Sequence, residues 1–471
     1  MSLAEAIAYG LRYNPRLQQA SAQVAAAREG AEIAFAPFLP DLTYQYFYEA
    51  FSLRVVPVAG FAPVVRRGAY SFSLNEFTVQ WTILDFGRRS GRYGQAISRA
   101  RAEALVLQRA RQTVAFDVAS AFFQLLAARA EVRVREEALR TAEAIRRDVG
   151  TRLAGGTVER EDVLRADVEV SRTAEELVAA RQSVLDAEAL LNQALGRPFG
   201  GPLIVADVAR RPPFVESLED CLRRAAALRP EIGASRQEIA GAAEGERSAR
   251  GAMLPKMDTL GSLFQANLPE TFNGWIGKAE IHVEQTLYAG GAKRAALRLA
   301  HAERDAAAAG LNVILNNLSA QVNLAHNAIA TDRERIRLNA VGAGQARENL
   351  RVVVTRYNNG DAIPTEVVDA QTALTGTEVR YYASVYSYLV DLARLEYAQG
   401  GDQSQLVALA SQPPQSDDQR IALPRDRDQR PEATPPSTPP PGPSAPEGDL
   451  PPALPGGLRG NLPVPRAGER H

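Results

Sequence analysis

Hydrophobic and polar residues along this chain follow a helical period in some stretches and a period of two in others. A helical pattern covers residues 3–36. Residues 42–48 and 70–84 then alternate between polar and apolar, which is typical of strands. A helix over residues 88–150 follows, and a return helix of about 40 residues completes the series. The pattern therefore predicts a first helical stretch, two strands and two long helices.

This series of elements occurs twice. Each half opens with serine and leucine, breaks its first helix before a proline and ends its return helix at a glycine. These positions are Ser2-Leu3, Asn14-Pro15 and Gly196 in the first half, and Ser217-Leu218, Arg229-Pro230 and Gly400 in the second. A period of about 200 residues is far longer than the ~20–50 residues of solenoid repeats. The chain is therefore a duplicated half-protein.

We expect two structural repeats, residues 1–216 and 217–411, followed by a proline-rich disordered tail over residues 412–471. The strand hairpins are predicted at about 42–84 and 258–288, and the long helix hairpins at about 88–196 and 292–400. At 1.5 Å per residue, the first helix of each long pair spans roughly 95 Å. No compact globule could contain such a helix.

The predicted strands place apolar side chains on one face and polar side chains on the other. The apolar faces contain Phe77, Val79, Trp81 and Ile83 in the first half, and Ala279, Ile281, Val283 and Leu287 in the second. The opposite face of the last strand contains Lys278, Glu280, His282, Glu284 and Thr286. This alternation indicates an apolar medium on one side and water on the other, as for membrane-spanning strands. Four strands cannot close a barrel of useful bore, so we expect three chains to supply twelve strands, with the long helices continuing the wall as a tube.

The motifs at the ends of the predicted elements recur in a fixed order. They are Leu84-Asp85-Phe86-Gly87 and Leu287-Tyr288-Ala289-Gly290-Gly291 before the long helices, Gly156 with residues 161–166 after the first turn, and Arg356-Tyr357, Gly360 and residues 366–371 around the second. In order, duplication and spacing, the chain from about Ser2 to Gly400 resembles the TolC-type outer-membrane efflux proteins. The resemblance implies a mainly α fold with a β-barrel part: a trimeric twelve-stranded outer-membrane barrel that continues into a long periplasmic α-helical barrel.

The same resemblance implies a function and a set of partners. The chain would be the passive exit duct of a tripartite efflux or type I secretion system, and not an enzyme. Its implied partners are two further copies of itself, outer-membrane lipid, a periplasmic adaptor (membrane fusion protein) and an inner-membrane pump of the RND, ABC or MFS type. It would lie in the cell outer membrane, with its helical part in the periplasm.

Candidate pore residues lie near the turns that join each long helix pair, where family members narrow and meet the adaptor. Glu366 and Asp369 lie three residues apart, hence on one face of the return helix. In a trimer they would form two stacked rings of carboxylates, which attract cations. The alternative interpretation is that they are ordinary first-turn acids favoured by the helix macrodipole. The first half has Asp162 but carries Arg165 where a second acid would stand.

Candidate gate and turn residues lie in the same region. Tyr357 matches a tyrosine that helps to hold the tip shut in some family members, but the arginine expected just after the turn is Ala362 here. Tyr357 therefore either takes part in a gate or packs between helices. Gly155, Gly156 and Gly360 are expected to form the two turns and to contact the adaptor.

Composition excludes several classes of function. The net charge of −1 indicates neither nucleic acid nor an anionic surface as a partner. The single cysteine, Cys221, excludes an internal disulfide and a multi-cysteine metal site, and its position predicts a small core residue. A polar strand face explains His282 with Glu280 and Glu284, so we predict no metal and no cofactor. No nucleotide-binding loop or catalytic triad stands out.

A soluble coiled-coil scaffold of long helical hairpins is the alternative function. No run of ~18 apolar residues predicts a transmembrane helix, and Met1-Ser2-Leu3 lies within the repeated motif, without a signal peptide. Either the protein is cytoplasmic or its export signal lies upstream of this start. The scaffold does not explain why alternating strands recur at the same place in each half, so the sequence favours the duct.

Overall fold

The computed structural model describes residues 1–471 except 57–63, 199–202, 209–210, 269–271, 412–420 and 422–471. All of the elements lie within one compact unit, Met1–Leu423. The first repeat contains α1 (Leu3–Tyr13), α2 (Pro15–Phe35), the 3-10 turn η1 (Ala36–Phe38), β1 (Asp41–Val56), β2 (Val64–Leu84), α3 (Arg88–Ala154) and α4 (Arg160–Leu195). The second contains α5 (Leu218–Leu228), α6 (Pro230–Gly251), β3 (Lys256–Leu268), β4 (Phe272–Glu284), α7 (Ala292–Asn358) and α8 (Pro364–Ala398), followed by α9 (Ser404–Ala410).

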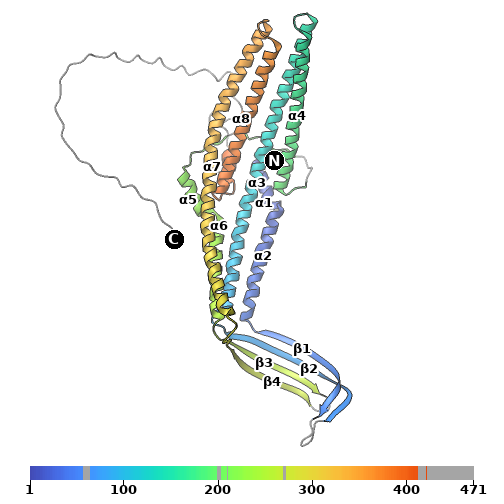
Figure 1. The fold of residues 1–471 in the computed structure, drawn as a ribbon, viewed down its shortest axis with the longest axis vertical. Coiled ribbons are helices and arrows are strands. Elements are labelled where there is room, and N and C mark those ends of the chain that lie inside the picture. Colours follow the sequence, from blue (N-terminus) through green and yellow to red (C-terminus); the bar gives the residue numbers. More distant parts are fainter. Residues whose placement is uncertain (57–63, 199–202, 209–210, 269–271, 412–420, 422–471) are drawn as a thin grey trace, which may run out of the picture. The chain divides into compact units, whose positions relative to one another are not determined.

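This element order confirms the predicted fold class, mainly α with a sheet part built from a duplicated β-β-α-α half (Figure 1). The last strand ends at Glu284, four residues before the predicted end of the hairpin at 288. Thr286 and Leu287 therefore lie beyond the strand, and Leu287 is 92% exposed. The tail predicted from residue 412 lies outside the described residues apart from Ile421, which is buried.

The four strands form one antiparallel sheet in the order β1-β2-β3-β4. The central pairing of β2 with β3 joins the two repeats, with Phe77 opposite Leu263 and Val79 opposite Gly261. The outer strands β1 and β4 each have a partner on one side within the described residues. Exposed strand edges can pair with strands of another chain, and both edges of this sheet are available for such pairing.

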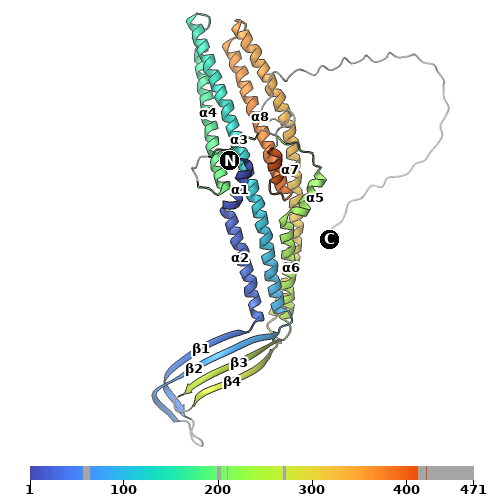
Figure 2. The ribbon, with the colours of Figure 1, turned by 180° about the vertical axis from the view of Figure 1, so that it is seen from behind.

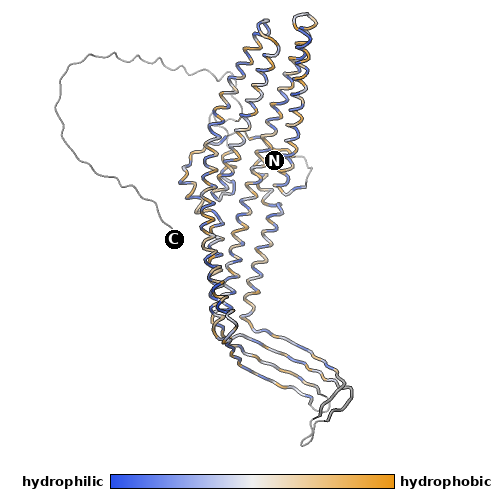
Figure 3. The backbone as a smooth tube through the Cα atoms, in the orientation of Figure 1, coloured by the Kyte–Doolittle hydropathy of each residue, from blue (hydrophilic) through white to orange (hydrophobic). Residues whose placement is uncertain are grey.

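The apolar face of this sheet is uncovered in the single chain. Phe77, Val79, Trp81 and Ile83 are each about two-fifths exposed, and Ile281 is 71% exposed. Apolar and polar residues alternate along the strands, as Figure 3 shows. The indole Nε1 of Trp81 donates to the Phe38 carbonyl at 2.9 Å, which ties this face to the turn after α2. An uncovered apolar face of this size is expected where a protein meets lipid.

The helices begin and end at the residues that the sequence marks. Ser2 caps α1 in a capping box with Glu5, and Ser217 caps α5. Pro15 and Pro230 start new helices after each break. Gly196 ends α4 with a φ of +74°, a conformation that glycine adopts without steric cost.

The largest hydrophobic core lies where the short helices meet the middle of the long ones. Its fully buried members include Phe122 and Phe123 of α3, Leu191 of α4, and Val385 and Leu389 of α8. Among the described residues, α3 is long enough and contains an 18-residue window apolar enough to cross a membrane, although the sequence analysis expected no such run. More than half of that window, 56%, is buried against other parts of the chain, as expected for a core helix.

Candidate functional site at the helical tips

The two long helix pairs, α3–α4 and α7–α8, turn at the same end of the helical bundle, away from the sheet (Figures 1 and 2). The two turns have the same backbone hydrogen bonds. Thr157 N donates to Arg152 O at 3.0 Å, and Asp361 N donates to Arg356 O at 2.9 Å. Gly156 and Gly360 have φ values of +71° and +87°, so both positions favour glycine. Gly155 has an ordinary helical φ of −81°, so its conformation does not require glycine.

Tyr357, at the end of α7, contacts an arginine from the other repeat. The Arg152 guanidinium of α3 lies 4.0 Å from the centre of the Tyr357 ring, and its Nη1 donates to the Tyr357 carbonyl at 3.2 Å. Asp148 holds this arginine through a 2.9 Å bond to its Nε. The sequence analysis looked for an arginine after the α7–α8 turn, at Ala362, and missed Arg152 because the contact crosses between repeats.

The Tyr357 side chain is buried, with 5% exposed, and its hydroxyl has no hydrogen-bond partner within the described residues. Burial raises the pKa of Tyr357 to about 12, and the nearby carboxylates of Asp148 and Asp162 add to this effect while Arg152 opposes it. The tyrosine is therefore neutral at physiological pH. Its ring and backbone, and not a phenolate charge, make the contact between the repeats.

The three candidate acids have different surroundings. Glu366 pairs through Oε2 with Arg356 Nη1 at 3.1 Å, and its Oε1 accepts the Ile363 amide at 3.4 Å. Asp162 accepts the Glu159 amide at 3.2 Å, as a capping residue at the equivalent place in the first repeat. Asp369 is exposed, and within the described chain it has neither a hydrogen bond nor an ion pair. Glu366 and Asp162 thus fit the role of acids that cap the first turn of a helix. Asp369 is the candidate acid whose carboxylate has no ion-pair partner among the described residues.

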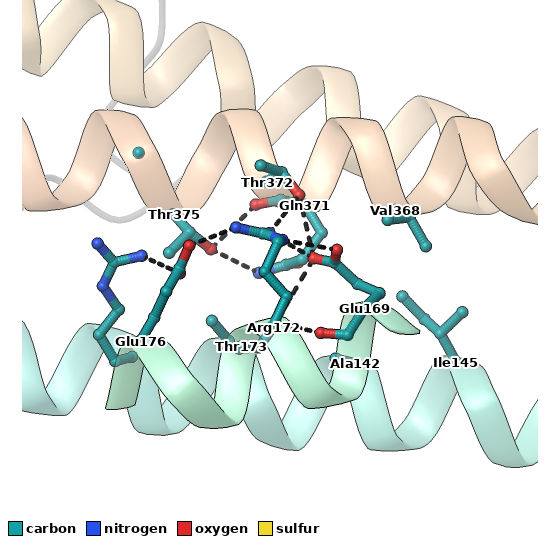
Figure 4. Close-up of a pocket in the computed structure, with 13 residues that line it drawn as sticks. Ala142, Ile145, Glu169, Arg172, Thr173, Glu176, Val368, Gln371, Thr372 and Thr375 are labelled. Atoms are coloured by element: carbon teal, nitrogen blue, oxygen red, sulfur yellow. Dashed lines mark hydrogen bonds and ion pairs between the residues drawn. The ribbon is translucent and has the colours of Figure 1, made fainter. Parts of the chain in front are cut away.

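Below the tips, a cavity of about 180 Å³ with both polar and apolar lining residues lies between the α3–α4 pair and α8 (Figure 4). Arg172 of α4 donates to Glu169 at 2.9 Å and to the Thr372 hydroxyl of α8 at 3.3 Å. The Thr372 hydroxyl also lies 3.3 Å from Glu169 Oε1. Arg135 and Arg172 both bond to Glu176 on the same side of the cavity. These residues were not singled out in the sequence, where an arginine between two glutamates on α4 reads as an ordinary exposed helix surface.

The described part of the chain offers no group of three or more His, Cys, Asp or Glu side chains that could hold a metal ion. The polar face of β4 is instead occupied by ion pairs, such as Lys278 with Glu280 at 2.6 Å. Cys221 is fully buried, and burial raises the pKa of its thiol. The tips offer contacts between helices and exposed charges.

Comparison with known proteins gives consistent results. A family model described as "Outer membrane efflux protein" matches residues 10–197 and 221–401. "Pyoverdine export outer membrane protein OpmQ" of Pseudomonas putida is 28% identical over 371 residues, which cover 76% of this chain and 77% of the relative. "Outer membrane efflux protein BepC" of Brucella suis is 22% identical over 392 residues, which cover 83% of each chain. The solved structure of the outer-membrane channel OprN superimposes with a TM-score of 0.75 at 19% identity, covering 85% of this chain and 90% of that one.

Proposed function

The chain belongs to the outer membrane efflux protein family and is an outer-membrane exit duct for efflux, and we propose that three copies of it form the duct. The observation that carries this function is the family match across both repeats, because each repeat supplies half of the strands and half of the long helices. Members of the family act as trimeric channels with adaptors and inner-membrane pumps, and they are channel proteins and not enzymes. The family places the chain in the outer membrane, with its helical part in the periplasm.

Two surfaces of the single chain support closure by further copies. The strands β1 and β4 each leave one edge free within the described sheet, and three such sheets joined edge to edge give twelve strands. Because α3 packs against α8, α4 and α7 lie on the outer sides of the two helix pairs. Both carry exposed apolar residues at these outer positions, among them Val168 and Val178 on α4, and Leu324 and Leu338 on α7. In our proposal, α4 of one copy packs against α7 of the next.

For the tips, we propose that the Arg152–Tyr357 contact holds the α7–α8 pair against the α3–α4 pair in the closed duct. Arg172, Glu169 and Thr372 supply a second set of bonds between α4 and α8 below it (Figure 4). Opening the duct requires the two helix pairs to separate, so both sets of bonds would break together. Asp369, which is exposed and unpaired among the described residues, is our candidate for a ring of carboxylates in the trimer. Glu366 adds less charge to such a ring because Arg356 neutralises it.

We further propose that the turns at Gly155, Gly156 and Gly360 are the contact with the periplasmic adaptor. The ideal Cβ positions at Gly156 and Gly360 have no atom within 4 Å, so both turns present open backbone to a partner. The adaptor would connect the duct to an inner-membrane pump, of the RND, ABC or MFS type, that supplies the energy. The duct itself would carry the substrate passively.

The test uses the full chain behind a working export signal. The chain is purified from outer membranes in detergent, and its mass is measured by light scattering corrected for detergent. We expect the mass of a trimer, and we expect this trimer to conduct ions in planar bilayers. A detergent-independent soluble monomer or dimer without conductance would contradict the proposal. That result would favour a soluble coiled-coil scaffold, in which the fold is retained without the channel.

A further inference from the structure

Two aspartates face each other inside the α7–α8 helix pair. Asp332 of α7 is 2% exposed and Asp391 of α8 is 6% exposed, and the two carboxyl groups lie within hydrogen-bonding reach of each other. Their surroundings are apolar core residues, among them Ile329, Ile336 and Leu395. A buried carboxylate is costly unless its charge is paired and its oxygens accept hydrogen bonds. The pair therefore requires a physical explanation.

Each aspartate has one arginine partner, three residues further along its own helix. Arg335 Nη1 lies 3.3 Å from Asp332 Oδ1, and Arg394 bonds to Asp391 Oδ1. Both arginine side chains are more than half exposed, so water screens their charges. The second oxygen of Asp332, Oδ2, is buried and has no hydrogen-bond donor within the described residues. Two ionised carboxylates are acceptors only, so neither can satisfy the other.

Other charged groups on the surrounding elements already have contacts of their own. They include Arg333 and His326 on α7, Asp117 on α3, Arg224 on α5, and Arg211 and Glu216 between α4 and α5. Arg333 donates to the Phe214 carbonyl, His326 lies against the Glu216 carbonyl, Asp117 pairs with Arg16, Arg224 pairs with Glu216, and Arg211 acts on Tyr388. None of these interactions supplies a donor to Asp332 Oδ2.

We propose that Asp332 and Asp391 bind one proton between them, as a carboxyl–carboxylate pair that joins α7 to α8. With this proton, the carboxyl group of one aspartate donates to the carboxylate of the other, and the buried Oδ2 gains the partner that it lacks. Burial raises the pKa of Asp391, and the neighbouring Asp332 adds to this effect against the opposing Arg394. The raised pKa is consistent with a proton held by the pair.

The sign of the pH dependence follows from that raised pKa. Because the pKa of Asp391 in the folded state lies above its unfolded value, the protonated pair contributes fully to stability at low pH. The contribution is lost as the pH rises through the folded pKa, when two buried negative charges face each other. The α7–α8 pair would therefore respond to the pH of the compartment around it.

The first repeat has no such pair at the equivalent positions. At the constant offset between the repeats, Ala128 and Ala187 correspond to Asp332 and Asp391. There, α3 and α4 are joined by an ion pair between Arg129 and Glu188 at 2.8 Å. The proposed proton site thus distinguishes the two halves of the wall.

The experiment is infrared spectroscopy of the purified full-length chain, in which a protonated aspartic acid has a carbonyl band separate from that of a carboxylate. We expect this band to persist above the pH at which an ordinary aspartate loses its proton, and to disappear as the pH is raised further. Asp332→Asn and Asp391→Asn should each abolish it, because the new amide supplies the donor and leaves the other aspartate ionised. Asp117→Asn is the matched control, since it removes another partly buried acid whose pKa burial raises, and it should leave the band of the pair unchanged.

Two results would overturn the proposal. One is the absence of the band in the native chain at every pH at which the chain stays folded. The other is a band that survives in Asp332→Asn, because a proton held by Asp391 alone needs no partner. If the variants do not fold, isotope-labelled aspartate in the native chain keeps the first test decisive. Neither test depends on conductance, so the inference can fail while the duct function holds.

Discussion

The two helical tips have the same turn but use their equivalent arginines differently. Arg152 and Arg356 occupy the same position in the two turns. The backbone carbonyl of each accepts a hydrogen bond from the amide of the residue five positions later. Arg152 stacks on Tyr357 and so joins the first repeat to the second, whereas Arg356 pairs with Glu366 and donates to Asp361 O within its own turn. Duplication therefore conserved the turn geometry, while the contacts of the side chains diverged. Of these two equivalent arginines, one thus joins the repeats and the other stays within its own turn.

The same divergence occurs at the break between the first two helices of each repeat. Asn14 caps α2 and donates from Nδ2 to Ala194 O at 2.7 Å. Arg229 stands at the equivalent break and donates to the equivalent carbonyl, Ala398 O, at 3.1 Å. Arg229 also binds Glu231 and Gln321, both at less than 3 Å. A compact cap in one repeat is thus replaced by a buried charged network in the other.

The largest expected effect concerns the glycines that pack against these breaks, Gly196 and Gly400. An alanine Cβ at Gly400 would lie 2.8 Å from the Leu228 carbonyl carbon, at a φ of +84°. Gly400→Ala should therefore reduce the free energy of unfolding by about 3 kcal/mol, from backbone strain and overpacking together. Gly360→Ala, with a φ of +87° and open space, should cost only about 1 kcal/mol. Denaturant resistance of the purified trimers measures both, and equal losses would contradict the role of the close contact.

A smaller difference should separate the two residues at the breaks. Arg229→Ala leaves Glu231 with Arg109 as its remaining cation and removes the donor to Ala398 O, at an expected cost of about 2 kcal/mol in unfolding free energy. Asn14→Ala removes a cap and one hydrogen bond, for about 1 kcal/mol. The same denaturation measurement applies. If Asn14→Ala proved the more damaging, the buried network of the second repeat would not be the stronger of the two.

At the tips, the equivalent arginines should affect channel opening unequally. Arg152→Ala removes the stacking and the hydrogen bond to Tyr357, which together stabilise the closed arrangement by about 1.4 kcal/mol, so the open fraction should rise about tenfold. Single-channel recordings in planar bilayers measure that fraction as the open probability. Arg356→Ala is the matched control and should change the open fraction little, because its bonds lie within one turn. A similar rise in both variants would show that the contact between repeats is not what holds the tip.

The smallest expected effect separates the two acids of the second tip. Asp369→Asn should lower the preference of the channel for cations over anions, because it removes a charge with no ion pair among the described residues. Glu366→Gln should lower it less, since Arg356 already neutralises that carboxylate. Reversal potentials in a salt gradient measure the preference. A larger effect from Glu366→Gln would place Glu366, and not Asp369, at the pore.

Local chemistry made much of this fold predictable from the sequence. Pro15 and Pro230 start helices, Gly156 and Gly360 take positive φ values, and alternation over residues 70–84 forms a strand, because each depends on neighbouring residues alone. The end of β4 was misplaced by four residues because Thr286 and Leu287 resume the alternation of polar and apolar residues after Glu284, although they have no strand partner among the described residues. The acidic candidates were located correctly on the return helix, but their surroundings were not predictable.

What the sequence determined by itself is the duplicated order of helices and strands, the position of both turns and the membership of the efflux family. What only the tertiary structure decided is which side chains meet across the repeats. Arg152 reaches Tyr357 over 205 positions, and Arg172 reaches Thr372 over 200, because α3 and α4 pack beside α7 and α8. Helix periodicity fixes the face on which a side chain lies, but not the neighbour that it finds there. That choice depends on how the long helices pack, and it gave two similar halves different contacts.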